Sequence, residues 1–597
     1  MTSTIRQRCA RASSGARVAL LGMTLATLTA PAFAADAPAK AGSTSSIRGH
    51  RPTGVVIASA HKLATEAGQE VIAKGGNAFD AAVAVSAVLS VVEPYSSGLG
   101  GGAFFLLHDA KSGRDVMVDA RETAAASAVP AKYLDAKGEL DRDRAENGPW
   151  SAGVPGLPAG LVHVAKTYGR VPLTVSLAPA IRIAEQGFPV NSHVANNYAD
   201  RRDVMERYEG TRKVYLADGD APKVGETLRQ PDLADTLRRI ATQGRDGFYR
   251  GQVAQRIVAD INKYGGEWTL ADMAGYAVRE RTPIRFRYRD WDIVTAPPPS
   301  SGGVALAEIL QVVEGWDLKA LDEPHRVHVL TEAMRRAYRD RTLWLGDPDF
   351  VQVPVARLTS DDYAAGLRAG IMPDKATPSA MLPGGKAPRE SGHTTHFSII
   401  DADGNLVAAT QTVNLTYGSG LIADGTGVLM NDEMDDFALK PGTPNAFGVM
   451  GYDANAVAPG RRMLSSMTPS FMLGADRVAV LGTPGGSRII TMVLLGMLGV
   501  EQGLSPAEVV ALPRFHHQYM PDTIELEPNA LPPASVEALQ AMGHAFTQRK
   551  STWGNMYAAD WNLVDGSVRG GSDPRSDVGA AIVVPAAAPK EPAKATP

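Results

Sequence analysis

Hydrophobic and polar residues alternate most regularly in one segment of the second half of the chain. Residues 394–401 read Thr-Thr-His-Phe-Ser-Ile-Ile-Asp, the turn 401–405 contains glycine and asparagine, and a second apolar run extends from Leu406 to Asn414. A period of two on each side of such a turn predicts a β-hairpin. The preceding segment, 377–393, is rich in proline and glycine and is therefore expected to form a loop.

Longer apolar runs predict helices. Residues 65–74 are expected to form a helix that ends at Gly75-Gly76. Asn77 is placed to cap a second helix, 78–92, which is almost wholly apolar and should be buried on all sides. A strand over 103–108, a strand over 478–481 and an apolar helix over 489–500 follow the same reasoning. Together these elements predict only a mixed α and β fold.

The first residues have the pattern of a secretory signal. Four arginines and no acidic residue precede an apolar run over 18–30, and Ala32-Phe33-Ala34 ends the segment. We expect residues 1–34 to be a signal peptide that is cut near Ala34, which predicts a periplasmic or secreted protein with no membrane segment left after its removal. The apolar run is too short for a membrane span.

Composition narrows the function classes further. The only cysteine, Cys9, lies in the expected signal peptide, so the mature chain would have no disulfide. The formal charge of −4 and the lack of a basic run argue against nucleic acid as a partner. The histidines are not at zinc-ligand spacings, and no metal or cofactor is expected. The ends, 35–45 and 585–597, are rich in Ala, Pro and Lys and are expected to be disordered.

Several short sequence motifs follow one another along the chain, and their order and spacing together are highly specific. They cover nearly all of the mature chain and lie at 75–82, 98–102, 121–122, 153–156, 297–303, 394–396, 412–414, 418–419, 431–437, 464–469, 482–487, 516–518 and 573–575. This set of blocks resembles the γ-glutamyltransferases, also called glutathione hydrolases, of the N-terminal-nucleophile hydrolase superfamily.

The resemblance implies an α+β fold, the four-layer αββα sandwich, and an autocatalytic cut between His393 and Thr394. The products would be a heavy fragment, 35–393, and a light fragment, 394–597, which remain together as a heterodimer. The cut would give Thr394 a free α-amine beside its own hydroxyl. That pair forms a nucleophile and its base within one residue.

The resemblance also implies the chemistry of the site. Thr394 would attack the γ-glutamyl amide of glutathione or a related compound, and water or an amine such as an amino acid or dipeptide would resolve the acyl-enzyme. The expected roles are a hydrogen-bond partner of the nucleophile (Thr412), backbone N–H donors to the oxyanion (Gly485, Gly486), ligands for the substrate carboxylate (Arg121, Ser465, Ser466) and acceptors for its ammonium (Asn414, Glu433, Asp436).

One position departs from the family pattern. Residues 440–457 resemble the lid of many bacterial members, which have a tyrosine at the position of Phe447. The hydroxyl of that tyrosine bonds to the residue matching Asn414, and Phe447 has no hydroxyl with which to do so. We expect a looser lid with easier entry of water, unless the nearby Tyr452 compensates.

Two other functions remain open at this stage. An acylase of the same fold would act on glutaryl or cephalosporin-like amides, whose acyl group lacks the ammonium that Glu433 and Asp436 are expected to bind. A binding protein on the same scaffold would remain uncut and would release no glutamate.

Overall fold

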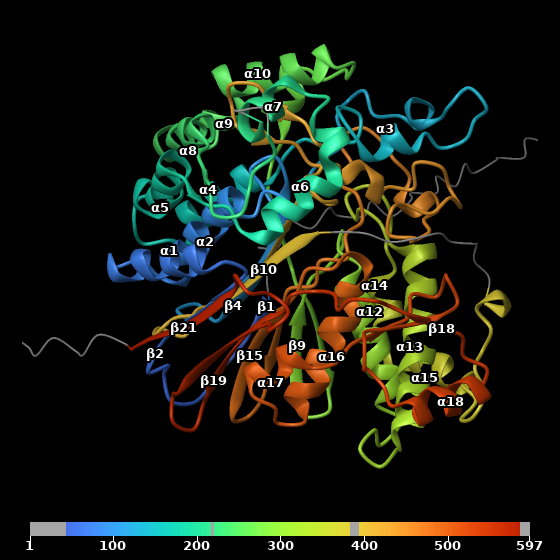
Figure 1. The fold of residues 1–597 in the computed structure, drawn as a ribbon. Coiled ribbons are helices and arrows are strands. Elements are labelled where there is room, and N and C mark those ends of the chain that lie inside the picture. The colour runs from blue at the N-terminus through green and yellow to red at the C-terminus, as the bar shows by residue number, and fades with distance from the viewer. Residues whose placement is uncertain (1–42, 217–219, 383–392, 586–597) are drawn as a thin grey trace, which may run out of the picture. The chain divides into compact units, whose positions relative to one another are not determined.

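The computed structural model describes residues 43–216, 220–382 and 393–585 (Figure 1). The expected signal peptide, part of the loop before Thr394 and the C-terminal tail after residue 585 lie outside these ranges. Within them, no helix combines the length and the apolar character that crossing a bilayer requires.

Two antiparallel sheets form the centre of the fold. The first has the strand order β1-β4-β3-β11-β10-β2-β21, with β7 also paired to β4. The second has the order β20-β19-β15-β14-β9-β8. The strands of the first sheet are β1 (Ser43–Thr44), β2 (Gly54–Ser59), β3 (Gly102–Asp109), β4 (Arg114–Ala120), β7 (Arg279–Arg281), β10 (Thr394–Ile400), β11 (Leu406–Thr412) and β21 (Ala580–Pro585). Those of the second are β8 (Ile284–Tyr288), β9 (Trp291–Thr295), β14 (Ser470–Leu473), β15 (Arg477–Gly482), β19 (Tyr557–Asn562) and β20 (Val568–Ser572).

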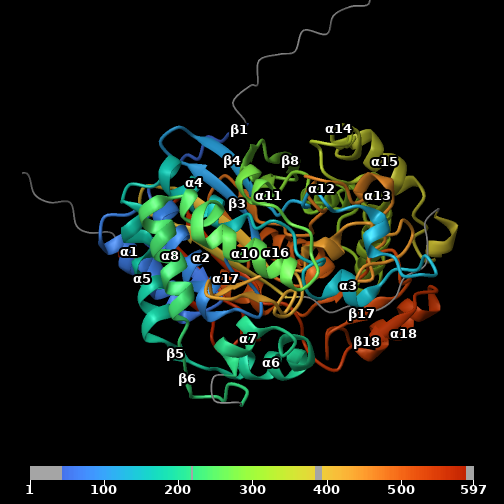
Figure 2. The ribbon, with the colours of Figure 1, turned by 90° about the horizontal axis from the view of Figure 1, so that it is seen from above.

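Helices cover the outer faces of both sheets. Helices α1 (Lys62–Ala73), α2 (Ala78–Val92), α4 (Leu157–Tyr168) and α5 (Leu173–Gln186) lie on the side of the first sheet, and α12 (Gly302–Val313), α16 (Ile489–Glu501) and α17 (Pro506–Ala511) lie on the second (Figures 1 and 2). Strand β10 contacts β15 and β19, so the two sheets pack face to face. The layers therefore follow the order helix, sheet, sheet, helix, as the resemblance implies.

The remaining elements surround this sandwich. The helices are α3 (Arg142–Glu146), α6 (Ser192–Met205), α7 (Glu209–Tyr215), α8 (Pro231–Gln243), α9 (Asp246–Tyr249), α10 (Gly251–Lys263), α11 (Leu270–Gly275), α13 (Glu323–Trp344), α14 (Val355–Leu358), α15 (Asp361–Ala369) and α18 (Pro533–Ala541). Short strands pair as β5 (Phe188–Pro189) with β6 (Thr227–Leu228), β12 (Ile422–Ala423) with β13 (Val428–Leu429), and β16 (Phe515–His516) with β17 (Ile524–Leu526) and β18 (Phe546–Gln548).

Local sequence signals account well for α2 and for the central hairpin. Helix α2 has the predicted bounds, and a capping box closes its start: the Asp80 N–H donates to Asn77 Oδ1 and the Asn77 N–H donates to Asp80 Oδ2, both at 3.0 Å. Every residue of α2 is buried. The hairpin is also confirmed, although β11 ends at Thr412, two residues before the predicted Asn414. Asn414 has a φ of 78°, which takes the chain out of the extended conformation.

The expectation of disorder at the two ends is wrong where the structure describes them. Ser43 and Thr44 pair with Asp115 and Arg114 of β4, and the buried Ser45 hydroxyl donates to Asp115. At the other end, Pro585 closes β21, which pairs with β2. Both strands lie at edges of the first sheet, where unpaired backbone groups accept an added strand whatever its composition.

Candidate active site

Thr394 begins β10 and faces Thr412 across the hairpin. Its Oγ1 donates a hydrogen bond to Thr412 Oγ1 at 3.3 Å, and Thr412 Oγ1 donates in turn to the carbonyl oxygen of His393 at 3.2 Å. The Asn414 N–H donates to the same Thr412 oxygen at 2.8 Å. One hydroxyl therefore contacts both the expected nucleophile and the carbonyl of the peptide bond that is expected to break.

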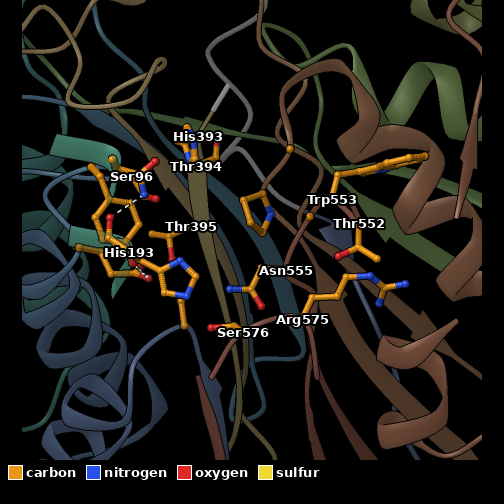
Figure 3. Close-up of a pocket in the computed structure, with 17 residues that line it drawn as sticks. Ser96, His193, His393, Thr394, Thr395, Thr552, Trp553, Asn555, Arg575 and Ser576 are labelled. Atoms are coloured by element: carbon orange, nitrogen blue, oxygen red, sulfur yellow. Dashed lines mark hydrogen bonds between the residues drawn. The ribbon is translucent and has the colours of Figure 1, made fainter. Parts of the chain in front are cut away.

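Two cavities meet at Thr394. The larger, of about 320 Å³, lies among Glu93, Tyr95, His393, Asn555 and other residues (Figure 3). The smaller, of about 20 Å³, lies on the other side and is the one that the sequence anticipates. Its lining includes ten of the predicted residues, brought together from segments far apart in the chain: Arg121, Thr394, Thr412, Asn414, Glu433, Asp436, Phe447, Ser465, Ser466 and Gly486. Gly485 lines the larger cavity.

Three charged residues of the small cavity, Arg121, Glu433 and Asp436, pair with one another. Arg121 Nη1 lies 2.5 Å from Glu433 Oε2, and Arg121 Nη2 bonds to Asp436. Burial raises the pKa of Glu433 well above its usual range, with Arg121 acting in the opposite direction. Burial also raises the pKa of Asp436. The groups expected to bind a carboxylate and an ammonium thus satisfy each other, which is the complementarity that a zwitterionic acyl group requires.

The glycine pair lies where β15 gives way to α16. Gly485 and Gly486 have φ values of 139° and 58°, which favour glycine, and they lead through a short 3-10 turn (Gly486–Arg488) into α16. A Cβ added at Gly486 would lie 2.6 Å from Cδ1 of Phe447. Glycine therefore allows both the backbone geometry and the close contact of the Phe447 ring with this segment.

Comparison with known proteins agrees with this geometry. The family model described as gamma-glutamyltranspeptidase matches residues 64–583. The chain belongs to the γ-glutamyltranspeptidase family. It is similar to the glutathione hydrolase proenzyme of Pseudomonas sp. (strain A14), 43% identical over 83% of this chain and 86% of the relative, and to that of Escherichia coli (strain K12), 40% identical over 87% and 90%.

The fold is also similar to that of solved structures. The crystal structure of the cephalosporin acylase from Bacillus halodurans covers 90% of this chain and 97% of its own, with a TM-score of 0.79 and 30% identity. The fold is accordingly the αββα sandwich of the N-terminal-nucleophile hydrolases, and the chain is an enzyme of the γ-glutamyltranspeptidase family.

The segment expected to be a lid, 440–457, contributes Phe447 and Val449 to the lining of the small cavity. The buried Phe447 lines the cavity, and its N–H donates to Asn445 Oδ1 at 3.1 Å. Asn445 Nδ2 donates to Asp436 Oδ1 at 3.2 Å, so this segment is bonded to an acidic residue of the cavity. Tyr452 is not among the residues that line the cavity. Whether the missing hydroxyl loosens the lid stays a prediction.

Sequence reasoning missed two polar residues that contact the candidate site. Gln518 Nε2 donates to the carbonyl of Phe447 at 3.1 Å, and its Oε1 accepts from Ser487 Oγ at 2.5 Å. Gln518 belongs to the motif at 516–518, but the sequence assigned that motif no role. Arg341, on α13, lines the small cavity and donates to Ser466 Oγ at 3.2 Å. Its helix carries charges on every face, so the sequence gives no sign that this arginine is buried.

His396, a member of the conspicuous Thr-Thr-His block, has a packing role in the structure. It is completely buried, its Nδ1 lies 2.9 Å from Thr410 Oγ1, and its Nε2 lies 3.1 Å from Ser398 Oγ. Burial lowers the pKa of His396 to about 3, which keeps the ring neutral. A Cβ at Gly482 would lie 2.3 Å from its Cε1, so the ring fills the space between the two sheets.

Proposed function

We propose that this chain is an exported γ-glutamyl hydrolase and transferase, which cuts itself between His393 and Thr394 and then acts on glutathione and related γ-glutamyl amides. The observation that carries the proposal is the chain of hydrogen bonds from Thr394 Oγ1 to Thr412 Oγ1 and from Thr412 Oγ1 to the His393 carbonyl oxygen. It supports the proposal because a hydroxyl donor contacts the carbonyl that would be cut, and a second threonine hydroxyl lies beside that donor.

The cut follows from this arrangement. Thr394 Oγ attacks the carbonyl carbon of His393, the C–N bond breaks, and the departing nitrogen takes up the hydroxyl proton. The donor from Thr412 supports the negative charge that develops on the carbonyl oxygen. Water then hydrolyses the ester, which gives a carboxylate at His393 and restores the Thr394 hydroxyl. The products are the fragments 35–393 and 394–597.

Turnover repeats the same chemistry on the substrate. The new α-amine, with an ordinary pKa near 8, accepts the proton of the Thr394 hydroxyl as it attacks the γ-carbonyl. The N–H groups of Gly485 and Gly486 would stabilise the oxyanion. The proton then passes to the leaving amine. Water releases glutamate from the acyl-enzyme, and an amino acid or dipeptide releases a new γ-glutamyl amide.

The charges of the small cavity favour a γ-glutamyl group over a glutaryl group. Arg121, Ser465 and Ser466 would bind the α-carboxylate, while Asn414, Glu433 and Asp436 would bind the α-ammonium. The B. halodurans acylase similarity keeps acylase activity as the second candidate. A glutaryl group, however, would leave the buried Glu433 and Asp436 without a cationic partner from the substrate, which is costly.

A Thr394→Ala variant tests the proposal. The parental protein should yield fragments of about 38 and about 22 kDa, in proportion to length from 63.0 kDa. N-terminal sequencing of the smaller should read Thr-Thr-His. Thr394→Ala should remain a single polypeptide and should not hydrolyse γ-glutamyl anilide, whereas Thr394→Ser keeps a hydroxyl and should still be cut. A Thr394→Ala protein that splits and hydrolyses glutathione at the parental rate would refute the proposal.

A further inference from the structure

Arg341 is a buried cation at the small cavity that lacks a carboxylate partner. The residue is 6% exposed and lines the cavity. Among the residues that the structure describes, no carboxylate oxygen lies within 4.0 Å of its nitrogens, in contrast to Arg121, which pairs with Glu433 and Asp436. Because a guanidinium stays protonated, Arg341 brings a positive charge to the cavity.

A buried charge of this kind is expensive. Removing a guanidinium from water is strongly unfavourable unless an opposite charge compensates for it. The acidic group that acts most strongly on the Arg341 pKa is Asp436, and Asp436 already bonds to Arg121. A ligand that brings its own negative charge would satisfy Arg341 without breaking the pairs that Arg121 makes.

Arg341 contacts the adjacent serines Ser465 and Ser466, here called the serine pair, directly or through Ser301. Its Nη2 donates to Ser466 Oγ at 3.2 Å, and its Nε donates to Ser301 Oγ at 3.0 Å. Ser301 Oγ donates onward to the carbonyl oxygen of Ser465 at 2.8 Å. Since Ser466 Oγ accepts from Arg341, its own proton remains available to a ligand in the cavity.

The position of Arg341 on α13 makes this arrangement rigid. The same helix presents Tyr338, whose hydroxyl donates to the carbonyl oxygen of Ser487 in the turn after the glycine pair. Residues 338 and 341 are three apart and therefore lie on one face of the helix. One helix face thus supports both the serine pair and the segment expected to hold the oxyanion.

We infer that Arg341 is a specificity-determining and positioning residue for the carboxylate of the donor's acyl group. This inference rests on the proposed function. Arg341 orients Ser466 as a hydrogen-bond donor and supplies a positive charge that is not already neutralised by Glu433 and Asp436. Because of this charge, the enzyme should prefer donors whose acyl chain ends in a carboxylate, whether or not they carry an α-ammonium.

The kcat/KM values of three anilide substrates distinguish this role from a general loss of structure or activity. γ-Glutamyl anilide has both charges, glutaryl anilide lacks the ammonium, and 4-aminobutanoyl anilide lacks the carboxylate. Arg341→Gln should lower kcat/KM about 50-fold for the first two, mainly through KM, as expected for the loss of charge-assisted hydrogen bonds. The value for 4-aminobutanoyl anilide should change less than about threefold. Arg341→Lys should recover part of the loss, because it restores the charge without the fork geometry.

Arg336 offers a matched control on the same helix. It is also buried, pairs with Glu332 and lies outside the lining of the cavity. Arg336→Gln should affect the three anilides alike. Equal losses on all three with Arg341→Gln, or no loss with γ-glutamyl anilide, would overturn the inference.

Arg341→Lys and one further variant, Ser466→Ala, keep the test decisive if Arg341→Gln is not cut into fragments. Arg341→Lys and Ser466→Ala should then show the same bias against the two carboxylate donors, about tenfold for the serine. The absence of that bias would overturn the inference. Failure of the proposed function is distinguishable, because it appears as a parental enzyme that does not hydrolyse γ-glutamyl anilide at all.

Discussion

A single oxygen atom distinguishes Phe447 from the tyrosine of many bacterial family members. The phenyl ring lines the small cavity together with Asn414, and it contacts Gly486. The backbone of Phe447 is held by two hydrogen bonds: its N–H donates to Asn445 Oδ1 within the expected lid, and its carbonyl accepts from Gln518 Nε2. The ring itself contributes apolar packing with Leu415 and Val449 and donates no hydrogen bond.

We predict that Phe447→Tyr shifts the enzyme from hydrolysis toward transfer. A hydroxyl that reaches Asn414 would add a hydrogen bond of about 1 kcal/mol to the closed lid and would restrict water. The ratio of transfer to glycylglycine over hydrolysis should rise about fivefold, which is that energy expressed as a rate ratio. The measurement is glutamate release and γ-glutamylglycylglycine formation from the same reaction.

Tyr452→Phe serves as the control for that experiment. If Tyr452 already compensates for the missing hydroxyl, removing it should lower the transfer ratio of the parental enzyme. An unchanged ratio in Phe447→Tyr would mean that the hydroxyl at position 447 has no part in excluding water.

Helix α2 ends on a carboxyl group in an unfavourable place. Glu93 is its C-cap, is buried, and lines the larger cavity beside Thr394. Its Oε1 accepts a hydrogen bond from the Tyr95 hydroxyl at 3.1 Å. Burial raises the pKa of Glu93 to about 7. The negative end of the helix dipole also disfavours the carboxylate.

This raised pKa predicts a pH-dependent cost. The neutral form stabilises the fold below the unfolded pKa of 4.5, and that stability is lost as the pH rises through about 7. Glu93→Gln should therefore match the parent at pH 4.5 and exceed its free energy of unfolding by up to about 3 kcal/mol at pH 8. Urea unfolding in a Thr394→Ala background measures this without interference from the cut.

Glu66→Gln, at an exposed position of α1, is the control and should show no such trend with pH. A Glu93→Gln difference that stays constant between pH 4.5 and pH 8 would mean that Glu93 does not ionise in this range.

Comparison of the predicted and observed elements shows which parts of the fold and the site the sequence predicts. The hairpin of β10 and β11 and the capped helix α2 follow from local pattern, because their turn and cap residues act within a few positions. The lining of the small cavity follows from family motifs. The buried Arg341 and the pair between Arg121 and Glu433 do not, because both depend on residues that meet only after the layers have packed. The same holds for the edge strands β1 and β21.

After the proposed cut, each of the two sheets would contain strands from both fragments. Strands β10 and β11 belong to the light fragment and lie between β2 and β3 of the heavy fragment. Strand β21, also light, pairs with the other edge of β2. In the second sheet, β14 of the light fragment pairs with β9 of the heavy one. Each fragment alone would leave several strands without their hydrogen-bond partners and would expose apolar core.

We therefore predict that the two fragments remain associated after the cut and unfold together. The processed protein should elute from a sizing column at the volume of the uncut Thr394→Ala variant, also in 1 M salt, because backbone pairing and apolar burial are little screened. Urea should separate the fragments in a single transition, seen alike by tryptophan fluorescence and circular dichroism. Elution of the light fragment by itself in buffer without denaturant would contradict this, since β10 and β11 would then have left the centre of a sheet whose neighbouring strands belong to the other fragment.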